Sequence, residues 1–200
     1  MFATFITDIG DSAVMTGVAL AGSLYLYFCG CRTSATALMA SLLLSAFMIG
    51  LFKLLFLGCG WLLPHHYDIR SPSGHAALSV SVMGTCALLI SGRLQNIWRF
   101  LPPLVAALLV IAIAVTRVTL DAHTVAEVVA GLASGAFALL PVYIFLRRCP
   151  LQGYDVNVFV LVIISAALLL HGTHFPAEDF IHAVAYYLGH SISVCARPAA

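Results

Sequence analysis

Residues 104–145 read LVAALLVIAIAVTRVTLDAHTVAEVVAGLASGAFALLPVYIF, two apolar runs around one short polar segment. As helices, the second run and the first run extended back to residue 98 are each long enough to cross a bilayer core of about 30 Å. The pattern therefore predicts two membrane-spanning helices joined by a connection that carries the polar groups.

Apolar composition extends along the whole chain. Of the 200 residues, 62% are hydrophobic and 8% are charged, whereas soluble domains carry roughly 25% charged residues. Too few charged side chains are present to cover the surface of a water-soluble fold. We therefore expect an all-α integral membrane bundle, with residues 1–200 forming a single membrane-embedded domain.

The distribution of apolar runs predicts six spans. They are expected near residues 12–29, 35–57, 72–91, 98–116, 123–146 and 156–171. The first span follows a polar stretch at residues 7–11. A further amphipathic helix, expected near 177–189, would lie in the membrane interface because its apolar residues share one face.

The arginines predict the orientation of the chain. Arg32, Arg93, Arg99, Arg147 and Arg148 all fall in loops on one side of the expected bundle, and such loops face the cytoplasm. We therefore expect a bacterial plasma-membrane protein whose polar pocket faces away from the cytoplasm. The net charge of +1, without a basic stripe, gives no indication of nucleic-acid binding.

One polar segment at the outer side is RSPSGH, residues 70–75. Ser71 is expected to cap the third span, with Pro72 at the first helical position. The next N–H groups would form an anion site, where Gly74 lets a ligand approach the backbone. His75 would then lie close enough to protonate a bound phosphate ester. An ordinary helix cap beside an incidental histidine explains this segment equally well.

The second polar segment runs from Arg117 to Glu127. His123 and Glu127 are four residues apart and share a helix face. The carboxylate can fix the imidazole tautomer and leave the other ring nitrogen free to attack. Arg117 offers a planar guanidinium suited to phosphate oxygens. The alternative is a buried His–Glu pair that only packs helices.

Three further residues near these segments are open to two interpretations. Lys53 closes the second expected span on the same side, where it either joins the pocket or extends to the membrane surface. Gly131 and Gly135 form a GxxxG step, which either allows close approach of another helix or occurs by chance in a helix rich in glycine and alanine.

At these motifs the chain resembles the type 2 phosphatidate phosphatase superfamily, also called the lipid phosphate phosphatases. The family shows three motifs, K-x6-RP, PSGH and SR-x5-H-x3-D. Residues 72–75 match the second motif in full. Residues 116–127 match the spacing of the third motif, with Thr116 in place of Ser and Glu127 in place of Asp.

The first motif of the family is mostly absent. Lys53 stands for its lysine, but Gly60 and Trp61 occupy the positions of the Arg-Pro step. Arg70, directly before the second motif, is a candidate replacement for the missing arginine.

The resemblance implies hydrolysis of a lipid phosphate or pyrophosphate through a phosphohistidine. Candidate substrates are a polyprenyl pyrophosphate, phosphatidate, phosphatidylglycerophosphate or a lipid A phosphate. His123 would be the nucleophile, Glu127 its orienting carboxylate and His75 the general acid. The phosphate would be bound by Lys53, Arg70, Ser73, Gly74 and Arg117. No metal or other cofactor is implied, and the expected partners are the lipid substrate and membrane lipids.

Three alternatives remain open from the sequence. A lipid phosphotransferase would use the same residues with another acceptor. An anion channel or transporter would use the anion site without a nucleophilic histidine. A metal site at His65, His66 and Asp68 is disfavoured, because adjacent histidines in an extended loop point apart.

Overall fold

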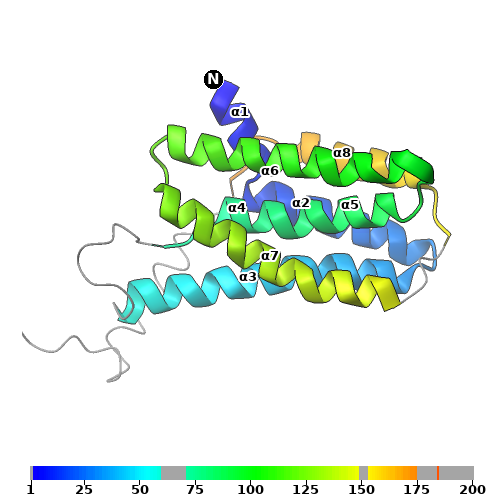
Figure 1. The fold of residues 1–200 in the computed structure, drawn as a ribbon, viewed down its shortest axis with the longest axis horizontal. Coiled ribbons are helices and arrows are strands. Elements are labelled where there is room, and N and C mark those ends of the chain that lie inside the picture. Colours follow the sequence, from blue (N-terminus) through cyan, green and yellow to red (C-terminus); the bar gives the residue numbers. More distant parts are fainter. Residues whose placement is uncertain (1, 60–70, 149–152, 175–183, 185–200) are drawn as a thin grey trace, which may run out of the picture.

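The computed structural model describes residues 2–59, 71–148, 153–174 and 184, and within these ranges the chain forms helices and no strands. The elements are α1 (Phe2–Ile9), α2 (Ser12–Phe28), α3 (Arg32–Cys59), α4 (Gly74–Leu78), the π-helical turn η1 (Ser79–Met83), α5 (Gly84–Ser91), the 3-10 helix η2 (Asn96–Phe100), α6 (Leu101–Thr119), α7 (Val125–Arg148) and α8 (Val156–Leu170). The long helices run side by side (Figure 1). The expected all-α membrane bundle is confirmed.

The expected spans all coincide with helices, but they differ in length. Four stretches are long and apolar enough to cross a membrane, namely Arg32–Leu54, Gly74–Ser91, Asn96–Thr119 and Val125–Arg148. The pair α1 and α2, bent by 42° at its break, supplies a fifth if it crosses as one unit. α8 is a shorter apolar helix of 15 residues. Length and composition thus support four or five of the six expected spans.

Two helices cannot be matched between the sequence prediction and the structure. α1 has no counterpart among the expected spans, because its eight residues are too few to register as one. The amphipathic helix expected near 177–189 lies, apart from residue 184, outside the described residues.

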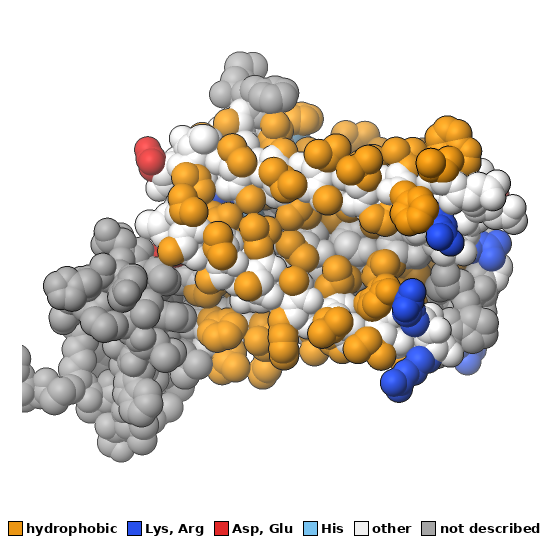
Figure 2. Space-filling model, viewed as in Figure 1, with side chains coloured by type: hydrophobic (Ala, Val, Ile, Leu, Met, Phe, Trp, Pro, Cys, Tyr) orange, Lys and Arg blue, Asp and Glu red, His pale blue; other side chains and the backbone are white. Residues whose placement is uncertain are grey.

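α2 packs against α3 and α8, while the stretch formed by α4, η1 and α5 packs against α3, α6 and α7. Val14, Met15, Leu26, Leu38 and Phe159 are at most 1% exposed. The outward-facing surface between the two ends is also rich in hydrophobic side chains (Figure 2). Apolar surface of this extent indicates contact with lipid rather than water.

Most of the arginine side chains gather at one end of the bundle. On the face seen in Figure 2 they lie where α7 ends, and Arg147 and Arg148 close that helix. The start of α7 and the start of α4 lie at the opposite end (Figure 1). The two polar segments picked out from the sequence therefore share one end, away from most of the arginines.

α4 packs directly on α7 at two glycines. A Cβ atom at Gly131 would overlap the carbonyl oxygen of Ser73, and one at Gly135 would overlap the carbonyl oxygen of Ala77. Gly131 and Gly135 therefore allow close approach of a second helix, which confirms the first interpretation of the GxxxG step. This contact sets the position of the Pro72–Gly74 backbone against α7.

Candidate active site

The connection between α6 and α7 folds back on itself. The carbonyl oxygen of Arg117 accepts hydrogen bonds from the backbone N–H groups of Ala122, at 3.1 Å, and His123, at 3.2 Å. Asp121 takes a φ of 52° in this turn, a left-handed conformation that Asp tolerates better than most residues. The turn brings His123 back to the end of α6.

His123 lies before α7 and not within its first turn, so the expectation that it shares a helix face with Glu127 is wrong. The contact between them forms through a capping box instead. Thr124 Oγ1 accepts from the N–H of Glu127 at 3.3 Å, and Glu127 Oε2 accepts from the N–H of Thr124 at 3.1 Å. The same Oε2 lies 2.9 Å from His123 Nδ1.

Glu127 also holds the PSGH segment in place. Its Oε1 accepts from the N–H of Ser71 at 3.0 Å, and its backbone carbonyl accepts from the N–H of Ser73 at 3.0 Å. The chain stays extended through Ser73, which has φ −69° and ψ 115° and is the N-cap of α4. Two expectations are thereby corrected: Ser71 does not cap the helix, and the Ser73 N–H is not free for an anion.

The hydroxyl group of Ser73 has a different environment. Its Oγ is buried and has no hydrogen-bond partner among the described residues. Gly74 begins α4, and a Cβ there would meet only Ile49 Cγ2, at an ordinary 3.7 Å, within the same residues. The described protein atoms therefore do not require glycine at this position, whereas close approach of a ligand would.

The electrostatic surroundings of His123 favour the neutral imidazole. Burial lowers the pKa of His123 below its usual value, against the opposing effect of the Glu127 hydrogen bond. The positive charges of Arg117 and Lys53 lower that pKa further. Because a carboxylate only accepts, the Nδ1–H of the neutral ring points to Glu127, and the lone pair resides on Nε2.

Lys53 and Arg117 approach the site from two different helices. Lys53, on α3, is 5% exposed, and its charge acts on His123. Arg117, on α6, donates from Nη1 to Thr7 Oγ1 at 3.3 Å. Lys53 is thus buried near the site rather than extended to the membrane surface. Arg70 lies outside the described residues.

His75 lies in the first turn of α4, and its Nε2 is 3.5 Å from Asp11 Oδ2. Asp11 is the N-cap of α2, with Oδ1 accepting from the N–H of Ala13 at 2.8 Å. The site therefore contains a second histidine–carboxylate contact, at a longer distance than that of His123.

Sequence reasoning missed three residues of this arrangement, Thr7, Asp11 and Thr124. Thr124 and Glu127 carry the T-x-x-E signature of a capping box, which is readable from the sequence. Asp11 before an apolar run is a readable N-cap signal, but nothing local pairs it with His75. Thr7 carries no signal at all.

A metal-binding arrangement is not seen in this part of the chain. Among the described residues, no group of three or more His, Cys, Asp or Glu side chains could hold a metal ion. The alternative site at His65, His66 and Asp68 falls outside them.

A model of the PAP2 superfamily matches residues 58–150. The matched segment contains the PSGH segment and the third motif, so the resemblance seen there is confirmed. Members of the PAP2 superfamily act as phosphatases on phosphate esters. No curated protein and no solved structure matches the chain. Thr7, Asp11 and Lys53 lie before the matched segment, although all three contact or act on residues inside it.

Proposed function

We propose that this protein hydrolyses the phosphate ester of a membrane lipid through a phosphohistidine on His123. The observation that carries the proposal is the 2.9 Å contact between His123 Nδ1 and Glu127 Oε2. That contact leaves Nε2 as the nucleophilic nitrogen, and the lowered pKa of His123 keeps it unprotonated.

The reaction has two steps at the phosphorus atom. His123 Nε2 attacks, a P–N bond forms, and the P–O bond to the lipid breaks as His75 gives its proton to the leaving oxygen. A water molecule then attacks the phosphorus, the P–N bond breaks, and His75 takes a proton from the water. Both histidines return to their starting states, and the products are the lipid alcohol and phosphate.

The charges around the site suit a phosphoryl group. Lys53 and Arg117 supply positive charge that stabilises the transition state. The buried Ser73 hydroxyl and the backbone at Gly74 offer further donors to the phosphoryl oxygens. Arg70 is part of the proposal as the replacement for the missing arginine of the first motif. These groups can act on the phosphate without a metal ion.

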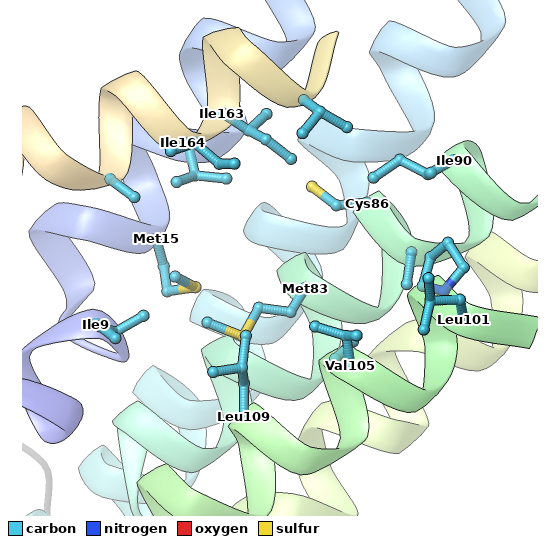
Figure 3. Close-up of a pocket in the computed structure, with 16 residues that line it drawn as sticks. Ile9, Met15, Met83, Cys86, Ile90, Leu101, Val105, Leu109, Ile163 and Ile164 are labelled. Atoms are coloured by element: carbon cyan, nitrogen blue, oxygen red, sulfur yellow. The ribbon is translucent and has the colours of Figure 1, made fainter. Parts of the chain in front are cut away.

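An apolar groove supports a lipid as the substrate. It has a volume of about 370 Å³ and lies between α2, α5, α6 and α8 (Figure 3). Met15, Met83, Leu109 and Ile163 line it, and Ile9 lines it two residues before Asp11. Asp11 Oδ2 lies 3.5 Å from His75 Nε2, so a lipid bound with its leaving oxygen at His75 would have this groove nearby for its chain. The hydrocarbon chain of a lipid fits this position.

The orientation expected from the arginines is also part of the proposal. The site would face away from the cytoplasm of a bacterial plasma membrane. In a variant whose native cysteines are replaced, Pro64→Cys should react with a membrane-impermeant reagent added from outside. Reaction only after the membrane is opened would place the site on the cytoplasmic side.

The function is tested by phosphate release from purified protein in detergent. Lipid phosphates and pyrophosphates with different head groups and chain lengths are compared with water-soluble phosphate esters. The proposal expects turnover of at least one lipid substrate, with KM falling as the chain lengthens. A folded protein that releases no phosphate from any of them would favour an anion channel or transporter, and transfer to a lipid acceptor instead of water would favour a phosphotransferase.

A further inference from the structure

Asp11 is a buried acidic residue outside the segment matched by the family. It is 6% exposed, and acidic side chains are seldom so buried unless they are paired. One carboxylate oxygen, Oδ1, caps α2 through the N–H of Ala13. The other, Oδ2, lies 3.5 Å from His75 Nε2 and 3.3 Å from His174 Nδ1.

The junction that carries Asp11 is fixed against the site. A Cβ at Gly10 would lie 2.8 Å from Ile113 Cγ2 and 2.9 Å from Ser79 Oγ, so the backbone here packs tightly on α6 and η1. Thr7, at the end of α1, accepts the hydrogen bond from Arg117. The chain directly before Asp11 is therefore held against α6 and η1.

We propose that Asp11 is a positioning residue for His75, the general acid of the proposed function on which this inference rests. With Nε2–H directed to Asp11, the ring is oriented and Nδ1 exchanges the proton with the leaving oxygen and then with water. The distance of 3.5 Å is longer than a well-formed hydrogen bond, and catalytic hydrogen bonds often tighten once substrate is bound. Asp11 would thus do for His75 what Glu127 does for His123.

The variant Asp11→Asn tests the role without removing the helix cap, because Asn and Asp cap helices about equally well. Release of the leaving group in the first turnover, before water hydrolyses the phosphohistidine, is measured on a lipid phosphate and on p-nitrophenyl phosphate. A lipid alkoxide needs a proton to leave, whereas nitrophenolate leaves without one. A residue that acts through the general acid therefore matters for the first substrate and not for the second.

The expected result for Asp11→Asn is a loss of roughly tenfold to a hundredfold in the first-turnover rate on the lipid phosphate, part of the 10²–10⁴ that a general acid contributes. Affinity for the lipid and the first-turnover release of nitrophenolate should change by less than about threefold. His75→Ala should show the same selectivity with a larger loss, and the double variant should be no worse than His75→Ala. Asp8→Asn, the same change at the same junction, is the matched control and should leave both activities intact.

Three results would overturn the inference while the proposed function stands. They are an active Asp11→Asn enzyme equal to wild type on both substrates, equal loss on both substrates, or the same loss in His174→Ala as in Asp11→Asn. If Asp11→Asn does not fold, Asp11→Ser keeps a capping oxygen and should show the same selective loss. A wild-type protein that turns over neither substrate would overturn the proposed function and this inference with it.

Discussion

His123 and Glu127 are close in the sequence and meet at the start of α7, where their side chains are 2.9 Å apart. His75 and Asp11 come from α4 and from the junction of α1 and α2, and their closest atoms are 3.5 Å apart. The first pair lies inside the segment matched by the PAP2 model, and the second pair lies half outside it. A local pair is fixed by one helix terminus, whereas a distant pair depends on how three elements pack.

The Glu127 carboxylate has other hydrogen-bond partners besides His123. It accepts from His123 Nδ1, from the N–H of Thr124 and from the N–H of Ser71. It therefore sets the imidazole tautomer and also ties the PSGH segment to α7. The Asp11 carboxylate combines two comparable tasks, capping α2 and facing His75.

Among the substitutions that test the two histidine–carboxylate pairs, Glu127→Gln should cause the largest loss of kcat. An amide has one accepting oxygen where the carboxylate has two, so the imidazole tautomer or the Ser71 contact is lost. We expect kcat to fall about a thousandfold or more, as when the orienting carboxylate of a catalytic triad is replaced by its amide. Glu127→Asp, which restores the residue of the family motif, should keep a measurable part of the activity. Near-normal kcat in Glu127→Gln would show that the pair only packs helices.

The features that depend on local spacing could be predicted from the sequence. Apolar runs predict α2 to α8 because a helix in lipid satisfies its own backbone groups. The His123–Glu127 spacing predicts the first pair because the contact forms within one short motif. Ser71 was assigned to the cap because Ser-Pro is a common helix start, and that reasoning could not include the carboxylate of Glu127 that holds its N–H.

The second pair could not be predicted from spacing. Asp11 and His75 meet only because Gly10 allows the α1–α2 junction to pack on η1 and α6. Neither residue carries a local sign of the other. The contact of Thr7 with Arg117 arises from the same packing.

Gly131→Ala should have the next largest effect, because it disturbs the packing that places PSGH against α7. The added methyl group would overlap the carbonyl oxygen of Ser73, which is rigid backbone. We expect a fall in kcat of roughly tenfold to a hundredfold, since small displacements of catalytic groups are costly, together with a lower unfolding temperature. Gly50→Ala is the control, because among the described residues no atom beyond its own helix backbone lies within 4 Å of a Cβ there. Equal behaviour of the two variants would contradict the close contact.

The pH dependence of kcat/KM tests the protonation state of His123, and its expected effect is smaller. In the proposed mechanism the attacking form of His123 is neutral, so kcat/KM should fall as the pH drops through its pKa. Burial lowers that pKa, which places the acid limb below the usual histidine value of about 6.5. Glu127→Gln should move the acid limb to still lower pH, because the carboxylate opposes the effect of burial. An acid limb above pH 6.5 in the free enzyme would contradict the environment described for His123.

Chelation of metal ions should have the smallest effect on phosphate release. In the proposed mechanism, Lys53, Arg117 and backbone donors stabilise the charge of the phosphoryl group that a metal ion would otherwise stabilise. We expect phosphate release to continue unchanged in excess EDTA. Complete loss of turnover that magnesium or zinc restores would point to a different mechanism at this site.

The most direct test of the central claim is to trap the phosphoenzyme on His123. Purified protein is mixed with a lipid phosphate carrying radioactive phosphorus and quenched in base within the first turnover. The wild type should carry label that is stable in base and lost in acid, as expected for phosphohistidine, and His123→Ala should carry none while remaining folded. Label that persists in His123→Ala, or label that is stable in acid, would contradict the account.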